Sequence, residues 1–386
     1  MKIAIITSHP VQYYAPWFRY LAGHGTDLRV FYLWDFGVKE THDPGFARSF
    51  QWDIPLLDGY EHEFVPNVAT DPGTHHPGGL DNPELQERVA AWNPGAVLLM
   101  GYSWKSMREF ILSRKRHRTP LLLRGDSHDL ARPRGLRTAA ARLAAGWIFR
   151  HLDAFLACGQ ANTEYFLNRG VRRDRIFFCP HTIDDGRFQR TPAVLEGAAS
   201  LRLEWGLPPD TRVVLFAGKF EEKKRPLDLL QAFRMSGVKN AHLVYVGSGP
   251  LETRLRDEIG TDPKVRVFPF QNQSQMPVVY AATDLLVLPS YGPSETWGLA
   301  IQEALACGLP VIASSHTGCA RDLIQLDRNG LVFPAGDVAS LARALTRALE
   351  PGILASWIPF CRSALERYNH EQAARGLAEA VTATRA

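Results

Sequence analysis

The chain has 386 residues, of which 45% are hydrophobic and 22% are charged. This composition is too apolar for a disordered chain, and the length is sufficient for two or three domains. The 44 lysines and arginines exceed the 40 aspartates and glutamates only slightly, which falls short of the strong positive charge of a dedicated nucleic-acid binder. The sequence therefore predicts a folded protein of more than one domain, with no nucleic-acid partner.

The cysteines and the apolar runs indicate the compartment. The five cysteines are far apart and form no Cys-x-x-Cys pair, which argues against a disulfide framework and a thiolate zinc site. The apolar run at residues 3–6 is too short for a signal peptide, and no later run is long enough for a membrane span. We expect a cytoplasmic protein. The basic, partly apolar segments 105–118 and 132–150 leave peripheral contact with the inner face of a membrane open, although ordinary packing is favoured for them.

Short apolar runs typical of buried parallel strands alternate along the chain with segments of helical spacing. In the first half these runs are residues 3–6, 28–33, 96–100, 121–123, 154–157 and 176–179. In the second half they are residues 213–217, 243–246, 265–268, 285–288, 311–313 and 331–333. The alternation predicts an α/β protein with two doubly wound domains, each built around an open parallel sheet.

A segment rich in Asp, Gly and Pro separates the two series, and we place the domains at residues 1–185 and 186–364. Apolar residues at helical spacing near the end predict a C-terminal helix, at about residues 365–386, that packs back on the first domain. Ligands of open α/β sheets bind outside the carboxyl ends of the strands. We therefore expect the active site between two facing domains.

The strongest functional signal is the segment 289–299, which continues to Glu303. It follows an apolar strand, and we expect a helix to begin near Thr296, with Glu295 at its start and Glu303 about two turns further on. Backbone N–H groups at a helix start lack partners within the helix and can bind a phosphate or a sugar hydroxyl. An extended ligand such as a nucleotide sugar could contact both carboxylates.

Two further strand ends carry basic residues or glycines. One predicted strand ends at Gly218 and Lys219, and Lys224 follows in a short basic loop, so both lysines are placed to neutralise a diphosphate. Gly247 and Gly249 form a strand-to-helix turn at which the backbone can approach a ligand closely. Each motif is weak alone, but their order and spacing on one sheet edge favour a nucleotide site.

The combination of Gly218-Lys219 with Lys224, Gly247-x-Gly249-Pro250 and Glu295-x7-Glu303 resembles the family-4 retaining glycosyltransferases, such as the bacterial group 1 glycosyltransferases. The resemblance implies the GT-B fold of two facing Rossmann-like domains, with a C-terminal helix on the N-terminal one. It implies that residues 186–364 bind a nucleotide-diphosphate sugar and residues 1–185 the acceptor. Among the donors, a UDP-sugar is favoured and a GDP-sugar is possible. The implied reaction is hexosyl transfer with retention, in glycan, glycolipid or glycoconjugate biosynthesis.

The resemblance also assigns roles to residues. Lys219 and Lys224 would bind the diphosphate and assist catalysis. Glu295 would bond the hydroxyls of the donor sugar and is a further catalytic candidate, and Glu303 would bond the ribose. Lys219 stands where many members have Arg. Lysine keeps the positive charge but lacks the planar guanidinium group, which can donate two parallel hydrogen bonds to a phosphate. The other predicted donor-binding residues are Gly218, Gly247, Gly249, Phe270, Gln271, Thr296, Trp297, Gly298 and Leu299.

The acceptor site is predicted from polar side chains that follow two strands of the first domain. The loop after the first strand contains His9, Gln12 and Tyr13 and lacks the Gly-rich turn of many relatives, so these side chains suit an acceptor. Arg124 and His128 follow a later strand and are predicted to bind the acceptor as well. Asp126, between them, is a catalytic candidate that could assist proton transfer.

We expect no metal and no cofactor other than the nucleotide-sugar co-substrate. No acidic pair suggests a metal site, and His75 and His76 lack matching ligands nearby in the sequence. Two alternatives remain open. A nucleotide-sugar epimerase of the same fold would form product without an acceptor, and a non-catalytic nucleotide-sugar-binding protein would bind the donor without transfer or hydrolysis.

Overall fold

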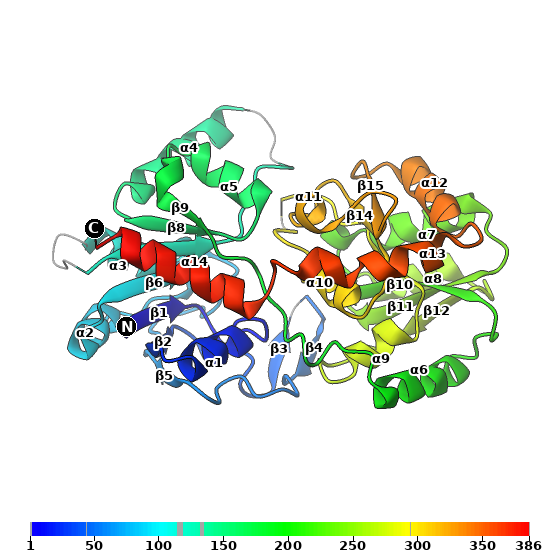
Figure 1. The fold of residues 1–386 in the computed structure, drawn as a ribbon, viewed down its shortest axis with the longest axis horizontal. Coiled ribbons are helices and arrows are strands. Elements are labelled where there is room, and N and C mark those ends of the chain that lie inside the picture. The colour runs from blue at the N-terminus through cyan, green and yellow to red at the C-terminus, as the bar shows by residue number, and fades with distance from the viewer. Residues whose placement is uncertain (1, 44, 114–118, 132–134, 294, 386) are drawn as a thin grey trace. The chain divides into compact units, whose positions relative to one another are not determined.

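The computed structural model describes residues 2–43, 45–113, 119–131, 135–293 and 295–385, which fold into two compact units (Figure 1). Unit 1 comprises residues 1–41, 54–182 and 368–386, and unit 2 comprises residues 42–53 and 183–367. The chain therefore passes from one unit to the other close to the expected boundary at residue 185. Residues 42–53 belong to unit 2, although the sequence predicts them in the first domain.

Unit 1 is built on a parallel sheet of seven strands in the order β5-β2-β1-β6-β7-β8-β9. The strands are β1 (Lys2–Thr7), β2 (Asp27–Tyr32), β5 (Glu61–Phe64), β6 (Ala96–Met100), β7 (Leu121–Gly125), β8 (Ala154–Ala157) and β9 (Ile176–Phe178). Its helices are α1 (Ala15–Gly23), α2 (Leu85–Trp92), α3 (Lys105–Leu112), α4 (Leu136–Phe149), α5 (Gln160–Leu167) and α14 (His370–Ala383). Strand order reverses at β1, as in a doubly wound sheet.

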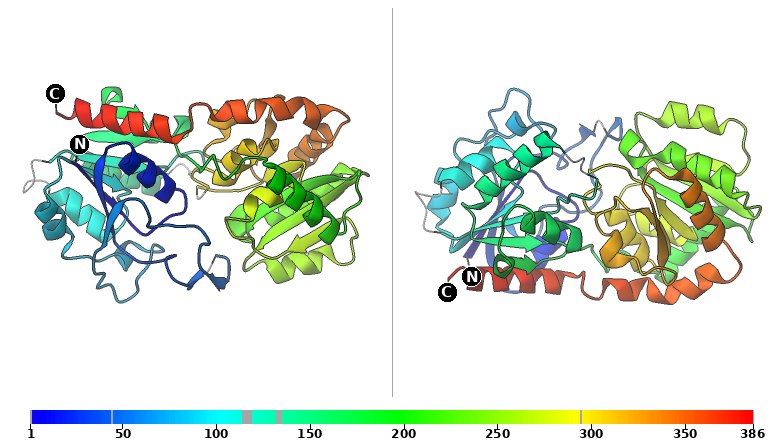
Figure 2. Two further views of the ribbon diagram at one scale, coloured as in Figure 1. Left: turned by 60° about the horizontal axis from the view of Figure 1, so that its bottom comes forward. Right: turned by 90° about the horizontal axis from the view of Figure 1, so that it is seen from above.

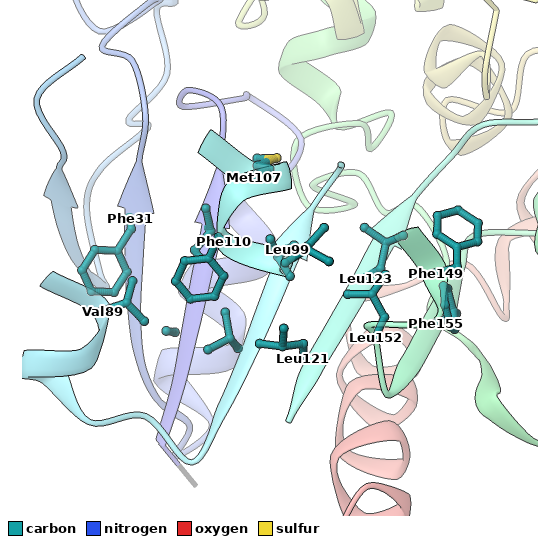
Figure 3. Close-up of a cluster of buried hydrophobic side chains, with 14 of the residues drawn as sticks. Phe31, Val89, Leu99, Met107, Phe110, Leu121, Leu123, Phe149, Leu152 and Phe155 are labelled. Carbon is teal, nitrogen blue, oxygen red and sulfur yellow. The ribbon is translucent and has the colours of Figure 1, made fainter. Parts of the chain in front are cut away.

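The core of unit 1 forms because helices cover the apolar strands. Leu99, Leu121 and Leu123 of the sheet pack against helix residues such as Phe110 and Phe149, all of them buried (Figure 3). The C-terminal helix α14 contacts β8, β9 and α1, and in Figure 2 it lies along the unit 1 sheet. The expectation that the C-terminal helix packs on the N-terminal domain is confirmed.

Unit 2 contains a second parallel sheet, of six strands in the order β12-β11-β10-β13-β14-β15. The strands are β10 (Arg212–Lys219), β11 (Ala241–Ser248), β12 (Val265–Phe268), β13 (Leu285–Leu288), β14 (Val311–Ser314) and β15 (Gly330–Phe333). Its helices are α6 (Pro192–Glu204), α7 (Pro226–Ser236), α8 (Glu252–Ile259), α9 (Met276–Ala281), α10 (Leu299–Ala306), α11 (Ala320–Leu323), α12 (Val338–Ala348) and α13 (Ile353–Trp357). The expected fold class, two Rossmann-like parallel-sheet domains, is confirmed.

Three strands have no counterpart in the sequence prediction. β5 reads Glu-His-Glu-Phe and lies at the sheet edge, where half of its residues are exposed and no apolar run is required. β3 (Thr41–Asp43) and β4 (Arg48–Phe50) form a separate two-stranded sheet in unit 2, and three residues are too few to show a pattern. In the described part of the chain, no helix combines the length and apolar character that crossing a membrane requires.

Candidate active site

The three motifs converge at the carboxyl ends of neighbouring strands of unit 2. The parallel register of β10 and β11 places Gly218 opposite Gly247 and Lys219 opposite Ser248. β13 pairs with the other side of β10, and the segment 289–299 follows it directly. The sheet therefore brings three segments to one edge, as the sequence predicts. They are the basic loop with Lys219 and Lys224, the glycine turn with Gly247 and Gly249, and the two-glutamate segment with Glu295 and Glu303.

A glycine is required where the ends of β10 and β11 meet. A Cβ atom at Gly247 would lie 1.9 Å from the carbonyl oxygen of Gly218, and the φ angle of Gly247 is 154°. Both the space and the backbone conformation therefore exclude other residues. The turn leaves the two strand ends in direct backbone contact at the edge where a ligand is expected.

An ion pair joins the basic loop to the two-glutamate segment. Lys224, at the end of the 3₁₀ turn Glu222–Lys224, donates to the carboxylate Oε2 of Glu295. The hydroxyl of Ser290 donates to the same oxygen at 2.6 Å. The side chains of Lys224 and Glu295 are largely shielded from solvent, so both charged groups are held in a defined position. The sequence predicted both residues for the site but not the role of Ser290.

The second predicted lysine has a partner that the sequence did not reveal. The Nζ atom of Lys219 lies 2.9 Å and 3.0 Å from the two carboxylate oxygens of Asp43, which is 176 residues earlier in the chain. The same ammonium group lies 4.8 Å from the ring centroid of Phe46, close enough for a cation–π contact. Lys219 is therefore held by Asp43 and Phe46.

The helix of the two-glutamate segment begins later than the sequence suggested. α10 begins at Leu299, and Gly298 is its N-cap, with a φ of 98°. The expectation of a helix start near Thr296, with Glu295 and Glu303 on one helix, is therefore wrong. Trp297 is fixed before the helix because its indole N–H donates to Gln302 at 3.1 Å and its carbonyl oxygen accepts from Cys319 at 2.9 Å.

Glu303 lies on α10 and is buried. The hydroxyl of Tyr280, at the end of α9, donates to its Oε2 atom at 2.7 Å. This contact orients the carboxylate, and no sequence motif marks Tyr280. Nothing in a lone tyrosine between two predicted strands indicates such a role, because 23 residues separate it from its partner.

The region predicted to lie beside a nucleobase is rich in aromatic rings. Phe270 follows β12, and its ring contacts those of Phe46 and Phe50 with centroid separations of 4.6 Å and 4.9 Å. Gln271 is half-buried beside it, and its amide N–H reaches the Pro269 carbonyl oxygen at 3.4 Å. Phe270 is thus covered by residues 42–53 of the same unit.

In unit 1 the structure groups one predicted acceptor-binding residue, Arg124, and one predicted catalytic residue, Asp126, around a histidine. Arg124 is buried, donates to the Pro180 carbonyl oxygen at 2.8 Å and lies against the ring of Tyr14. Asp126 lies 3.5 Å from Nε2 of His181, whose ring stacks on Tyr14. Burial, and then the charge of Arg124, lower the pKa of His181, so its ring is neutral at pH 7. These contacts favour a structural role for Arg124.

The other predicted acceptor residues lie in separate surroundings. His9 has its Nδ1 atom 3.0 Å from the Ser8 hydroxyl and its ring edge-on to Phe36. Gln12 and Tyr13 lie in the turn before α1 and are half-buried. His128 is buried, and its Nδ1 accepts the Leu130 N–H at 3.3 Å. Their roles toward an acceptor stay predictions.

The expectation that His75 and His76 lack a matching ligand is wrong. Asp71 lies beside them, and potential ligand atoms of the three residues lie within 4.8 Å of one another. Nδ1 of His76 accepts the Gly78 N–H, so its Nε2 carries the proton and donates to the Asp71 carbonyl oxygen at 3.0 Å. This hydrogen bonding explains the grouping without an ion. Metal independence stays a prediction.

Two protein-family models match the chain. The model described as glycosyl transferases group 1 matches residues 199–357, and the glycosyl transferase 4-like domain matches residues 10–181. The D-inositol 3-phosphate glycosyltransferase of Mycolicibacterium smegmatis is 27% identical over 297 residues, covering 69% of this chain and 64% of the relative. That of Saccharomonospora viridis is 28% identical over 347 residues, covering 79% and 78%.

A solved structure with a similar fold is Anabaena HepE in complex with UDP. It is 19% identical, has a TM-score of 0.76 and covers 99% of this chain and 100% of its own. The same protein with UDP-glucose has a TM-score of 0.74 at 18% identity, covering 99% of each chain. The likeness to these structures and the two parallel-sheet units show the GT-B fold. The two family matches, which together cover residues 10–181 and 199–357, show that the chain belongs to the group 1 glycosyltransferases.

Proposed function

We propose that the protein transfers a hexose from a UDP-sugar to an acceptor hydroxyl with retention of configuration, in the synthesis of a glycan, glycolipid or glycoconjugate. The observation that carries the proposal is the convergence of Lys219, Lys224, Glu295 and Glu303 at one edge of the unit 2 sheet. The HepE structures with UDP and UDP-glucose support the choice of base and sugar class. GDP-sugars are the next candidates.

In this proposal the lysines act on the leaving group. Breaking the bond between the sugar and the phosphate builds negative charge on the departing diphosphate, which preorganised cations stabilise more in the transition state than in the ground state. Lys219 and Lys224 supply the positive charge, Glu295 bonds the donor-sugar hydroxyls, and Glu303 bonds the ribose. The N–H groups at the start of α10 bind the distal phosphate.

Retention follows if the acceptor attacks the face from which the diphosphate departs. The acceptor oxygen forms the new bond to the anomeric carbon, the old bond to the phosphate oxygen breaks, and that oxygen takes the acceptor proton. No dedicated protein base is then required, and Asp126 can assist the proton transfer. We also propose that no metal takes part, because the two lysines provide the charge that a divalent ion would supply.

The test is the formation of UDP from UDP-glucose with excess chelator, with and without a pool of cell-derived glycan and lipid acceptors. We expect slow hydrolysis alone, faster UDP formation with acceptors, and no loss on chelation. An altered sugar nucleotide formed without acceptor would indicate the epimerase. Binding without hydrolysis or transfer would indicate the non-catalytic protein, and loss of activity in chelator would contradict metal independence.

We propose in addition that the protein is cytoplasmic and that α4 contacts an anionic membrane surface. This contact would place the enzyme on the inner face of the membrane near lipid-linked acceptors. Leu136, Leu143 and Trp147 on α4 are exposed. Residues 136–150 contain three arginines and no acidic residue, so apolar and basic groups are exposed together. Residues 114–118 and 132–134 of the two basic segments lie outside the described residues.

Co-sedimentation with vesicles of phosphatidylglycerol and phosphatidylcholine tests this contact. We expect Leu143→Glu to reduce the bound fraction several-fold, because it removes an apolar contact and adds a charge that anionic lipid repels. Leu203→Glu is the matched control, since Leu203 on α6 is 77% exposed and Leu143 is 75% exposed. Equal losses for both variants, or no binding by the unchanged protein, would contradict the proposal.

A further inference from the structure

Residues 42–53 are fixed on the carboxyl edge of the unit 2 sheet by polar contacts at three places. The Ser248 hydroxyl, at the end of β11, donates to the Phe46 carbonyl oxygen at 2.8 Å. Asn272, after β12, donates from its side chain to the Gln51 carbonyl oxygen at 2.7 Å. The backbone N–H of Ser274 donates to Asp53 at 3.1 Å. The segment therefore has a defined position over the predicted donor site.

Asp43, Gly45 and Phe46 form the tip of this segment, which lies beside Lys219 and the glycine turn, where the diphosphate is predicted to bind. A Cβ atom at Gly45 would lie 2.3 Å from a carboxylate oxygen of Glu221 and 2.7 Å from Nζ of Lys219. A Cβ atom at Gly249 would lie 3.0 Å from the Gly45 carbonyl oxygen. A diphosphate bound by Lys219 at the glycine turns would thus need space that Asp43 and Gly45 occupy.

The Asp43 carboxylate and a bound diphosphate would compete for Lys219 because both are negatively charged. Both carboxylate oxygens of Asp43 bind the ammonium group of Lys219, which is the interaction that a diphosphate would make. The carboxylate is preorganised, because its Oδ1 also accepts the N–H groups of Gly45 at 2.8 Å and Phe46 at 3.1 Å. A second anion at Lys219 would be repelled by this fixed carboxylate.

We propose that Asp43 sets the affinity of the donor site for nucleoside diphosphates by competing with the diphosphate for Lys219. In the donor-free protein Asp43 holds the ammonium group, donor binding displaces the tip, and the return of the tip assists release of the nucleoside diphosphate product. The inference rests on the proposed function, because it assumes that Lys219 binds the donor diphosphate.

The test is calorimetric titration of UDP and of uridine into the unchanged protein and Asp43→Asn. Asparagine can still accept the two backbone N–H groups but is neutral, so the tip keeps its local hydrogen bonds. We expect Asp43→Asn to bind UDP about three- to tenfold more tightly, a range typical of one partly shielded charge pair. The affinity for uridine, which has no phosphate, should not change.

Two further variants separate competition from a structural effect. In a Lys219→Met background, Asp43→Asn should tighten UDP binding clearly less than in the unchanged protein, because the contested ammonium group is absent and only the direct repulsion between Asp43 and the diphosphate is relieved. Asp327→Asn removes an exposed negative charge elsewhere in unit 2 and should leave UDP affinity unchanged. An equal gain in UDP affinity with and without Lys219 would overturn the competition. A similar gain in Asp327→Asn would also overturn it.

The outcomes distinguish a failure of the Asp43 competition from a failure of the proposed donor-binding function. UDP binding of equal or lower affinity in Asp43→Asn overturns the competition and leaves the donor site intact. Equal tightening for UDP and uridine also overturns it, since the phosphate would not be involved. The absence of UDP binding by both proteins overturns the donor site and the inference together.

Discussion

Replacing Lys224 with alanine is expected to lower the turnover number by a factor on the order of 10² to 10³, the usual effect of removing one group that stabilises transition-state charge. That factor corresponds to about 3 to 4 kcal/mol of transition-state stabilisation. The effect should be large because the ammonium group is shielded and fixed by Glu295, which itself bonds the donor sugar in our proposal. Steady-state kinetics of UDP formation provides the measurement.

Lys223 offers a matched control in the same short loop. Its ammonium group pairs with Glu221, and its side chain is more exposed than that of Lys224. Lys223→Ala removes the same charge from the adjacent position and should leave the turnover number within about twofold, as expected for a surface ion pair. Equal effects of the two substitutions would show that only the net charge of the loop matters. An unchanged rate in Lys224→Ala would remove its role at the leaving group.

Replacing Gly247 with alanine is expected to destabilise the protein by about 3 kcal/mol and to abolish UDP binding. The added Cβ atom would overlap the Gly218 carbonyl oxygen, and the φ of 154° disfavours any side chain. The ends of β10 and β11 must then separate, which displaces Lys219 from its position. Urea unfolding followed by tryptophan fluorescence measures the loss in free energy of unfolding.

Gly206 provides the comparison for Gly247. Its φ of 63° is also in the left-handed region, but a Cβ atom there would meet no atom within 4 Å. Gly206→Ala should therefore cost only the backbone strain, about 1 kcal/mol, and keep UDP binding. Equal losses of stability for the two variants would contradict the close approach of β10 and β11.

The sequence predicts the central strands well because both faces of each sheet are covered by helices. A strand such as β13 must then be apolar at every position, and all four of its residues are buried. The same argument locates the donor-site motifs, since Lys219, Gly247 and the segment after β13 each follow such a run. Parallel pairing alone then brings them to one edge.

The missed features depend either on a contact between distant parts of the chain or on a local backbone conformation. Asp43 lies on a three-residue strand without a recognisable pattern, and only the folded structure shows that it reaches Lys219. The sequence predicts the start of α10 too early because Thr296 and Trp297 are compatible with a helix, whereas the left-handed Gly298 delays its first residue to Leu299. Asp71 joins His75 and His76 through a loop conformation that no periodicity encodes.

Thermal unfolding in the presence of UDP, GDP and ADP tests the donor-site assignment most directly, because a ligand that binds only the folded protein stabilises it by about 2.7 kcal/mol at a hundredfold excess over its Kd. We expect UDP to raise the unfolding temperature of the unchanged protein and of Lys223→Ala, and to raise that of Lys224→Ala much less. No shift with any of the three nucleotides, or an equal shift in Lys224→Ala, would contradict the assignment.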